Sequence, residues 1–331
     1  MRTIRWGIIG CGDVTEQKSG PAFARAANSA LVAVMRRDGA KAADYARRHG
    51  VPRWYDDARR VIDDPEVDAL YVATPPDAHE AYAAMAAAAG KPAYVEKPMG
   101  RTYEECGRMV GAARRAGTKL FVAYYRRSLP RFLKVKELLD TGAIGQVRFA
   151  NVRLYQPAAK EDHDPARLPW RVRPGVAGGG KFLDLACHTL DLLDFLLGPV
   201  TSARGHATNQ AGLYPAEDLV TGSFAFASGA LGAGVWCFTS HHREATVELV
   251  GEMGRLTFST FGGADPVRLE TTGESEDFHI PHPAHIQQPM IQAVVDELNG
   301  VGASPSTGET AARTNRVMDQ LLMDWRMSRI G

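Results

Sequence analysis

Short apolar runs alternate with longer segments of helical composition over the first 124 residues. The apolar runs are typical of buried parallel strands and lie at 4–9, 31–35, 69–73 and 120–124, with a further run that ends at Glu96-Lys97. The segments between them predict helices at 21–28, 40–48, 77–89 and 101–116. Strands that alternate with helices predict a parallel, doubly wound sheet of the Rossmann type.

The pattern changes after Tyr124. A helix at 129–139 and a long extended run at 146–155 are followed by successive strand-like runs at 200–207, 219–227, 231–239, 246–250 and 256–259. Short turns between them indicate an open, mostly antiparallel sheet. We therefore predict an α/β protein with two domains, a dinucleotide-binding domain at 1–124 and a substrate-binding and oligomerisation α+β domain at 125–331.

The predicted helices are too few to cover both faces of the second sheet. Segments 181–197 and 288–298 could cover one face, and 310–327 predicts a closing helix. An apolar second face favours a partner subunit, so we expect a homodimer or homotetramer formed through this sheet.

Charge and composition narrow the class of partner. The formal net charge is +1, with 39 Lys and Arg against 38 Asp and Glu, which predicts no affinity for nucleic acid or an anionic membrane surface. The four cysteines are scattered without a CxxC pair, and because the first residues run directly into a predicted strand and no long apolar run exists, we expect neither a signal peptide nor a membrane span. We expect a cytoplasmic protein that binds a small molecule and holds no structural metal.

A glycine turn follows the first predicted strand. Gly10-Cys11-Gly12-Asp13-Val14-Thr15 has the spacing of a dinucleotide-binding turn, with Thr15 at the place of the usual third glycine. Gly10 would allow the tight turn, and Gly12 would let the backbone approach a pyrophosphate at a helix N-terminus. We expect Gly10 to Val14 to bind the cofactor.

The second predicted strand ends at Arg36-Arg37, where dinucleotide folds place the residue that reads the ribose. An acid there would repel a 2′-phosphate, whereas an arginine fork attracts it. We therefore expect NADP(H) to be preferred, with NAD(H) possible. Asp38 could still serve a ribose hydroxyl if the strand ends later.

The ends of other strands also carry polar residues. Lys97 closes a strand and precedes Pro98, and the carboxyl ends of strands in such sheets line the ligand crevice. Solvated charges at a strand end are the plain alternative for Glu96 and Lys97.

A glycine run, Gly178 to Gly180, opens the most informative stretch of the second domain. On a helix, Asp184 and His188 share one face, and a carboxylate beside a histidine suits proton transfer. The alternatives are a surface pair or a divalent metal held with Asp191. The loop histidines His279, His282 and His285 are separated by prolines and predict a loop rather than a metal site.

Taken together, these motifs resemble the Gfo/Idh/MocA oxidoreductases, the glucose–fructose oxidoreductase and inositol dehydrogenase group. The resemblance rests on Gly10-Cys11-Gly12, Ala73-Thr74-Pro75-Pro76 with His79, Glu96-Lys97-Pro98, the Asp184 to Asp191 helix and Ser306-Thr307-Gly308-Glu309. It implies hydride transfer between a nicotinamide and a sugar, polyol or sugar-derived carbonyl, with Lys97, Asp184 and His188 as catalytic residues.

Further site residues follow from the same resemblance. Thr74, Pro75, His79, Glu96 and Lys97 would bind cofactor. Asp184 and His188 would also bind substrate, together with Tyr124, Arg126, Trp170 and Arg171, although these last four could equally be rim or interface residues. A non-catalytic dinucleotide-binding sensor and an NAD-assisted hydrolase or lyase remain alternatives, because a fold does not fix a function.

Overall fold

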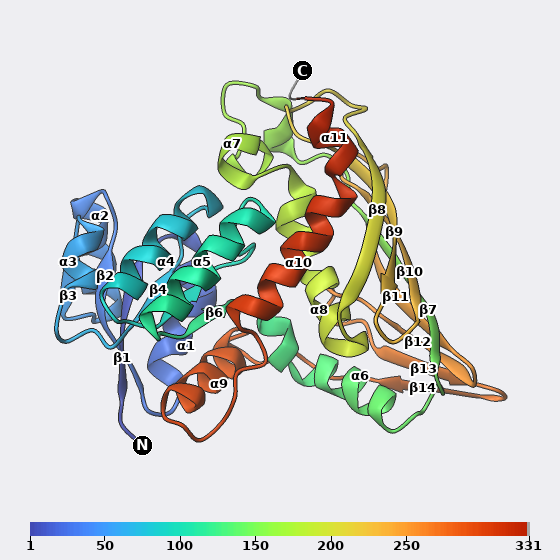
Figure 1. Ribbon diagram of the computed structural model, residues 1–331, viewed down its shortest axis with the longest axis horizontal. Coiled ribbons are helices and arrows are strands. Elements are labelled where there is room, and N and C mark those ends of the chain that lie inside the picture. The colour runs from blue at the N-terminus through green and yellow to red at the C-terminus, as the bar shows by residue number, and fades with distance from the viewer. Residues whose placement is uncertain (330–331) are drawn as a thin grey trace. The chain divides into compact units, whose positions relative to one another are not determined.

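The computed structural model describes residues 1–329 and divides into two compact units (Figure 1). One unit comprises Met1–Leu129 and Pro283–Ala312, and the other comprises Pro130–His282 and the chain from Arg313 onward. The hydrophobic pattern of the sequence does not predict that residues 283–312 belong to the first unit. Among the described residues, no helix is long and apolar enough to cross a membrane.

The first unit is built on a six-stranded sheet with the order β3-β2-β1-β4-β5-β6, in which every neighbouring pair is parallel. The predicted doubly wound sheet is therefore confirmed. Its strands are β1 (Ile4–Ile9), β2 (Ser29–Met35), β3 (Arg53–Tyr55), β4 (Ala69–Val72), β5 (Ala93–Val95) and β6 (Leu120–Val122).

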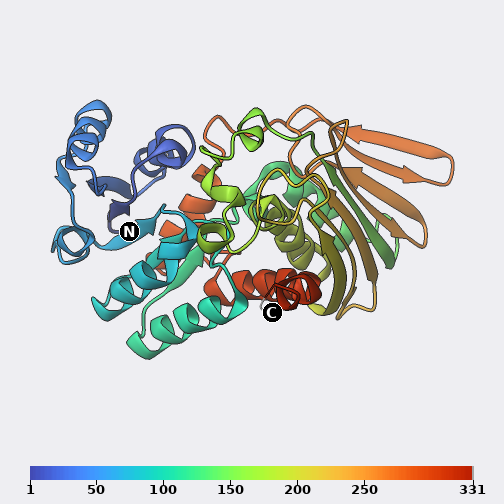
Figure 2. The same cartoon turned by 90° about the horizontal axis from the view of Figure 1, so that it is seen from above.

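Helices connect these strands, and α4 and α5 run side by side along the unit (Figures 1 and 2). The helical elements are η1 (Thr15–Ser19), α1 (Gly20–Arg25), α2 (Gly39–His49), α3 (Ala58–Ile62), η2 (Pro76–Ala78), α4 (His79–Ala88), α5 (Tyr103–Ala116), η3 (Tyr125–Ser128) and α9 (Gln288–Leu298). The first helix differs from the prediction, because it includes the π-helical η1 and ends at Arg25. Pro21 is the second residue of α1, directly after the π-helical segment, and the first turn of a helix tolerates the missing N–H of a proline.

Aromatic side chains fill the core of the first unit beneath the carboxyl ends of its strands. Trp6 packs on Phe23 at 4.9 Å between ring centroids, Phe23 on Tyr71 at 5.0 Å, and Tyr71 on Tyr94 at 5.3 Å. All four rings are buried. The hydroxyl of Tyr71 connects this aromatic layer to Glu96, one of the predicted site residues that follow β5.

The second unit is built on an eight-stranded sheet with the order β14-β13-β12-β11-β7-β10-β9-β8. Only β7 and β10 pair in parallel, so the predicted, mostly antiparallel sheet is confirmed. Its strands are β7 (Val147–Tyr155), β8 (Val200–Thr208), β9 (Leu219–Phe226), β10 (Leu231–Cys237), β11 (Glu244–Gly251), β12 (Gly254–Phe258), β13 (Val267–Thr271) and β14 (Glu274–Phe278).

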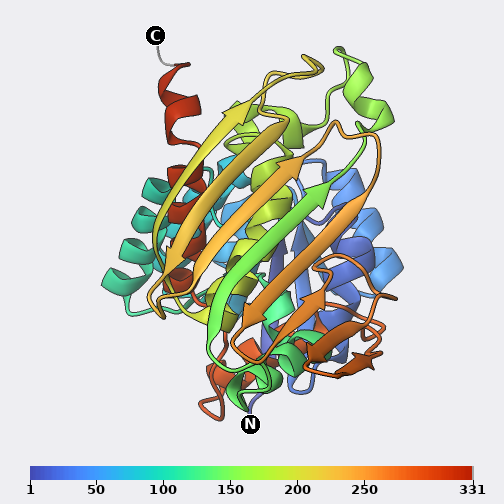
Figure 3. The same cartoon turned by 90° about the vertical axis from the view of Figure 1, so that its right-hand side faces the viewer.

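Helices cover one face of this sheet, and the other face carries none of the helices in residues 1–329 (Figure 3). On the covered face, Phe182 packs edge-on against Trp236 at 5.1 Å, and Leu321 lies against the small residues Gly205 and Gly222. The helical elements are α6 (Pro130–Asp140), η4 (Lys160–His163), η5 (Trp170–Val172), α7 (Pro174–Ala177), η6 (Phe182–Ala186), α8 (Cys187–Leu197), α10 (Gly308–Leu321), which belongs to this unit from Arg313 onward, and α11 (Met323–Met327). The helix predicted at 310–327 is thus two helices, which meet at Leu322.

Candidate active site

The glycine turn after β1 is held against the end of β2. The N–H groups of Gly10 and Cys11 both donate to the carbonyl of Met35, at 2.8 and 3.0 Å. Gly10 has a φ of 91°, and a Cβ there would lie 2.8 Å from Thr74 Cγ2, so this position requires glycine. Burial raises the pKa of the Cys11 thiol to about 11, which makes it a packing residue rather than a nucleophile.

Thr15 replaces the usual third glycine by folding back on the turn. Its hydroxyl donates to the carbonyl of Gly12 at 2.8 Å and accepts from the N–H of Gly12 at 2.9 Å. The N–H groups of Asp13 and Val14 lie in the first helical turn, where the helix itself offers no acceptor. A Cβ at Gly12 would meet nothing closer than 3.9 Å, so the space over the turn can admit a pyrophosphate.

The arginines at the end of β2 lie where the sequence predicts the ribose-reading residue. The strand ends at Met35, and the Arg36 guanidinium donates to the carbonyl of Cys11 at 3.3 Å, which places it beside the glycine turn. Arg37 is exposed. Asp38 caps helix α2 by accepting from the Lys41 N–H at 3.2 Å, and this hydrogen bond lowers the pKa of its carboxyl.

His79 is fully buried at the start of α4, behind Thr74 and Pro75. Its Nε2 lies 2.8 Å from the carbonyl of Thr74, and its Nδ1 lies 3.1 and 3.2 Å from the carbonyls of Pro98 and Met99. Burial lowers the pKa of this imidazole. The ring lies between backbone acceptors that follow β4 and β5, and a neutral imidazole, which carries one N–H, can donate to only one of these two sides.

Glu96 and Lys97 follow β5 at the carboxyl end of the sheet. The Glu96 side chain is 6% exposed and accepts three hydrogen bonds, from the Tyr71 hydroxyl at 2.5 Å, the Gln287 amide at 2.9 Å and the Lys97 N–H at 3.0 Å. Lys97 itself is partly exposed. A buried carboxylate thus fixes the peptide from which the lysine side chain extends.

The predicted helix of the second unit begins with a π-helical segment, η6, and continues as α8. Asp184 is 9% exposed and His188 is 4% exposed. Arg171 Nε donates to Asp184 Oδ2 at 3.1 Å, and the Arg171 guanidinium lies 4.5 Å from the centre of the Trp170 ring. The structure therefore brings Trp170 and Arg171 together with Asp184, although the sequence motifs do not link them.

The Gly178 to Gly180 run positions this helix against a buried glutamate. Glu217 Oε1 accepts from the Gly180 N–H at 2.7 Å, and a Cβ on Gly179 or Gly180 would lie about 3 Å from Glu217. Burial raises the pKa of Glu217 to about 7. Only glycine leaves room for this carboxyl beside the start of the helix.

Asp191, one turn beyond His188, has a hydrogen-bond partner on another helix. It is fully buried, and its Oδ1 accepts from the Thr314 hydroxyl at 3.4 Å. Within residues 1–329, no group of three His, Cys, Asp or Glu side chains is arranged to hold a metal ion. Asp191 therefore joins α8 to α10.

Tyr124 and Arg126 are buried rather than exposed. Tyr124 is 0% exposed, and the Arg126 guanidinium lies over the Tyr125 ring at 5.0 Å. Their contact with substrate stays a prediction.

Three site residues have no signal in the sequence. Tyr71 and Gln287 hold Glu96, and the Phe261 ring lies edge-on to His188 at 6.0 Å. Gln287 and Phe261 stand in loop segments with no motif around them, and Tyr71 looks like any apolar strand residue. Only the spatial arrangement identifies them.

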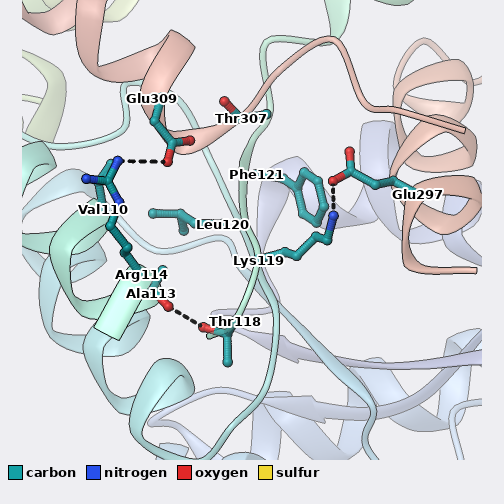
Figure 4. Close-up of a pocket in the computed structure, with 10 residues that line it drawn as sticks. All are labelled: Val110, Ala113, Arg114, Thr118, Lys119, Leu120, Phe121, Glu297, Thr307 and Glu309. Carbon is teal, nitrogen blue, oxygen red and sulfur yellow. Dashed lines mark hydrogen bonds and ion pairs between the residues drawn. The ribbon is translucent and has the colours of Figure 1, made fainter. Parts of the chain in front are cut away.

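A separate pocket of about 290 Å³ lies at the opposite end of the first sheet, near the amino end of β6 (Figure 4). The ion pairs Arg114–Glu309 and Lys119–Glu297 flank it. Because Glu96, Lys97 and the glycine turn all lie at the carboxyl ends of strands, this pocket does not contain the predicted site.

Comparison with known proteins decides the family. Residues 4–124 match the model of the oxidoreductase family with an NAD-binding Rossmann fold, and residues 132–257 match the GFO/IDH/MocA C-terminal domain. The chain belongs to the Gfo/Idh/MocA oxidoreductases. The resemblance noted from the sequence is therefore confirmed, and the protein is a nicotinamide-dependent oxidoreductase.

Relatives of this family member match along nearly its whole length. It is 38% identical to oxidoreductase P35 of Formosa agariphila over 96% of this chain and 97% of that protein. It is 29% identical to 1,5-anhydro-D-fructose reductase of Ensifer adhaerens over 92% of this chain and 91% of that protein. A structure of levoglucosan dehydrogenase with NADH and levoglucosan has a TM-score of 0.86 at 23% identity, covers 98% of this chain and 97% of its own, and supports the fold.

Proposed function

We propose that this oxidoreductase interconverts a hydroxyl and a carbonyl group on a sugar, polyol or sugar-derived carbonyl, with NADP(H) as the preferred cofactor. The observation that supports it most directly is Lys97, fixed by Glu96 at the carboxyl end of β5. Two similar proteins carry a sugar-derived compound in their names, 1,5-anhydro-D-fructose reductase and levoglucosan dehydrogenase. Both names point to the same substrate class.

The bound nicotinamide would supply or accept the hydride, and the chain's own residues would handle charge and protons. Lys97 offers a cation to the reacting oxygen and so favours the negative charge that develops there. His188 accepts or returns the hydroxyl proton, and Asp184, held by Arg171, orients the substrate or His188.

Two substitutions test these assignments. A panel of 1,5-anhydro-D-fructose, levoglucosan, aldoses, inositols and keto-sugars is first screened with both cofactors by nicotinamide absorbance. With the best substrate, Lys97→Met and His188→Ala are each expected to lower kcat by about 100- to 10,000-fold while the cofactor still binds. Lys136→Met and His206→Ala serve as surface controls. Unchanged kcat in either site variant would overturn that residue's assignment, and sugar cleavage without net cofactor turnover would favour the hydrolase alternative.

The proposed preference for NADP(H) rests on Arg36 and Asp38. Arg36 lies beside the glycine turn, where a 2′-phosphate would gain a charge-assisted contact, and Asp38 is occupied as the cap of α2. We expect the wild type to bind NADPH at least about 10-fold more tightly than NADH, and Arg36→Asp to remove this difference. Arg59→Asp, an equal charge change on α3, is the control. Tighter binding of NADH by the wild type would refute the preference.

The proposed homo-oligomer rests on the uncovered face of the second sheet. Leu231 is 61% exposed and Phe149 is 39% exposed, and the two residues are direct partners in the β7–β10 pairing. Along β12 to β14 the same sheet instead carries ion pairs such as Arg255–Glu270 and Arg268–Asp277. An apolar patch bordered by charge suits a second copy of the chain. Leu231→Asp should yield a monomer by light scattering, whereas Thr257→Asp should not, and a monomeric wild type at micromolar concentration would exclude this interface.

A further inference from the structure

The segment that carries Lys97 is held on both sides of the lysine. Before it, the Glu96 carboxylate accepts from the Lys97 N–H at 3.0 Å. After it, the carbonyls of Pro98 and Met99 lie 3.1 and 3.2 Å from His79 Nδ1. These carbonyl oxygens can only accept, so the hydrogen bond on this side depends on a proton carried by His79.

The opposite edge of the same imidazole reaches a different segment. His79 Nε2 lies 2.8 Å from the carbonyl of Thr74, which follows β4 and precedes Pro75. Thr74 in turn lies next to the glycine turn, since a Cβ on Gly10 would meet its Cγ2 at 2.8 Å. One buried ring therefore stands between the lysine segment and the segment that borders the predicted cofactor turn.

Burial makes this bridge more than an incidental contact. His79 is 0% exposed, so no bulk water can replace its partners, and a neutral imidazole, which carries a single N–H, can donate from only one of its two edges. A full imidazole inside the first unit also has no surface from which to contact a ligand directly. Its effect on the reaction has to pass through the backbone that it holds.

We propose that His79 is a positioning residue, which sets the placement of Lys97 relative to the segment that follows β4, and that the contact from Nδ1 to the Pro98 and Met99 carbonyls is the one that matters for turnover. The proposal rests on the role proposed above for Lys97. It replaces direct cofactor binding, which the resemblance implies for His79, by an indirect role.

Three substitutions separate the two edges of the ring. His79→Phe keeps an aromatic ring and removes both nitrogens. His79→Asn places an amide N–H near the Nδ1 position, on the Lys97 side. His79→Gln extends an amide N–H towards the Nε2 position, on the Thr74 side. His241→Phe, at an exposed histidine, controls for the substitution itself.

Two measurements are made on each variant. The first is kcat and KM with the best substrate of the panel and NADPH. The second is backbone hydrogen exchange of peptides that cover residues 73–78 and 97–101, which does not depend on turnover. His79→Phe is expected to lower kcat by about 10- to 100-fold with a smaller change in KM, and to speed exchange at 97–101. His79→Asn should recover kcat and protection at 97–101, and His79→Gln, whose N–H lies on the Thr74 side, should recover neither.

The outcomes distinguish this proposal from the proposed function. If Lys97→Met keeps its turnover but the His79 variants show the expected exchange pattern, the catalytic role of Lys97 is refuted and the positioning role of His79 is supported. Normal kcat and normal exchange at 97–101 in His79→Phe would overturn the bridge. Equal recovery of kcat by Asn and Gln would also overturn it, because the Nδ1 contact would then have no special part. Should His79→Phe fail to fold, the Asn and Gln pair decides alone.

Discussion

Two buried glutamates brace the two predicted functional segments in different ways. Glu96 receives donors on both carboxylate oxygens, from Tyr71, Gln287 and the Lys97 N–H. Glu217 receives the Gly180 N–H on Oε1, and within the described residues its Oε2 has no hydrogen-bond partner. Both carboxyl oxygens of Glu96 therefore accept hydrogen bonds, whereas within residues 1–329 only one oxygen of Glu217 does so.

This difference teaches what a buried carboxyl can be used for. A charge in the interior is tolerated where hydrogen bonds replace water, and it is penalised where they do not. Glu217 shows the penalty, because burial raises its pKa from the ordinary value of 4.5 to about 7. Glu96 acts as an acceptor for three donors, whereas Glu217 chiefly fills space beside the glycine run and accepts one bond.

Removing the Glu96 carboxylate should have the largest effect. Glu96→Ala leaves the Tyr71 hydroxyl, the Gln287 amide and the Lys97 N–H without their acceptor in a buried place. At about 1 kcal/mol or more for each unmet group, we expect a loss of about 3 kcal/mol in the free energy of unfolding, together with a large loss of kcat.

Chemical denaturation and steady-state kinetics measure the two effects. Glu96→Gln keeps one acceptor oxygen and should fall between the alanine variant and the wild type, and Glu104→Ala, at an exposed glutamate of α5, should change neither quantity. Wild-type stability in Glu96→Ala would show that the network does not brace Lys97.

Neutralising Glu217 should have the opposite sign and depend on pH. The native state keeps the Glu217 proton up to about pH 7, whereas the unfolded chain releases it near 4.5, so stability due to this group falls as the pH rises through this window. The full difference corresponds to about 3 kcal/mol. Glu217→Gln cannot ionise and keeps an oxygen for the Gly180 N–H, so it should be more stable than the wild type above pH 7 and similar to it near pH 4.5.

Thermal unfolding from pH 4.5 to 8.5 checks this expectation. Glu276→Gln, an exposed substitution on β14, should give a curve parallel to that of the wild type. A parallel curve for Glu217→Gln would mean that Glu217 is ionised throughout the range.

The comparison also shows how far the sequence predicts the fold and the site. Apolar runs located the first sheet except its edge strand β3, because the inner strands are buried on both faces, as in β4 and β5, whereas β3 is short and partly exposed. In the second sheet, β13 and the edge strand β14 are missed because most of their residues are polar and at least partly exposed. Lys97 and Asp184 stand in motifs, but the partners Gln287 and Arg171 come from other segments, and pairings of this kind depend on the folded backbone.

His79 illustrates the same limit for a single residue. Its place in a family motif suggests a cofactor contact, but no pattern of neighbours reveals that both of its nitrogens face carbonyls. The sequence therefore identifies His79 as a candidate site residue but does not predict which groups it contacts.

The segment predicted to bind substrate, which includes Arg171 and Asp184, should respond through binding rather than stability. Arg171 is half exposed, and exposed ion pairs contribute less than about 1 kcal/mol, so Arg171→Met should leave the melting temperature nearly unchanged. Because Arg171 holds Asp184 Oδ2, we expect KM to rise about 10-fold, which is about 1.4 kcal/mol, with a smaller change in kcat. Arg173→Met in the same loop is the control, and an equal rise in KM there would assign the effect to loop charge instead.

The smallest effect is expected at Asp38, where the structure separates helix capping from cofactor recognition. Its carboxylate accepts from the Lys41 N–H and lies 3.4 Å from Lys41 Nζ, so it is occupied at the start of α2. Asp38→Ala should lower the melting temperature slightly, as loss of an N-cap does. The ratio of the NADPH and NADH dissociation constants should stay as in the wild type, because Asp38 is not needed to read the ribose. Asp38→Ser restores a capping oxygen without the charge and should recover stability. A selective loss of NADH affinity in both variants would instead assign Asp38 to the ribose and weaken the case that Arg36 alone sets the cofactor preference.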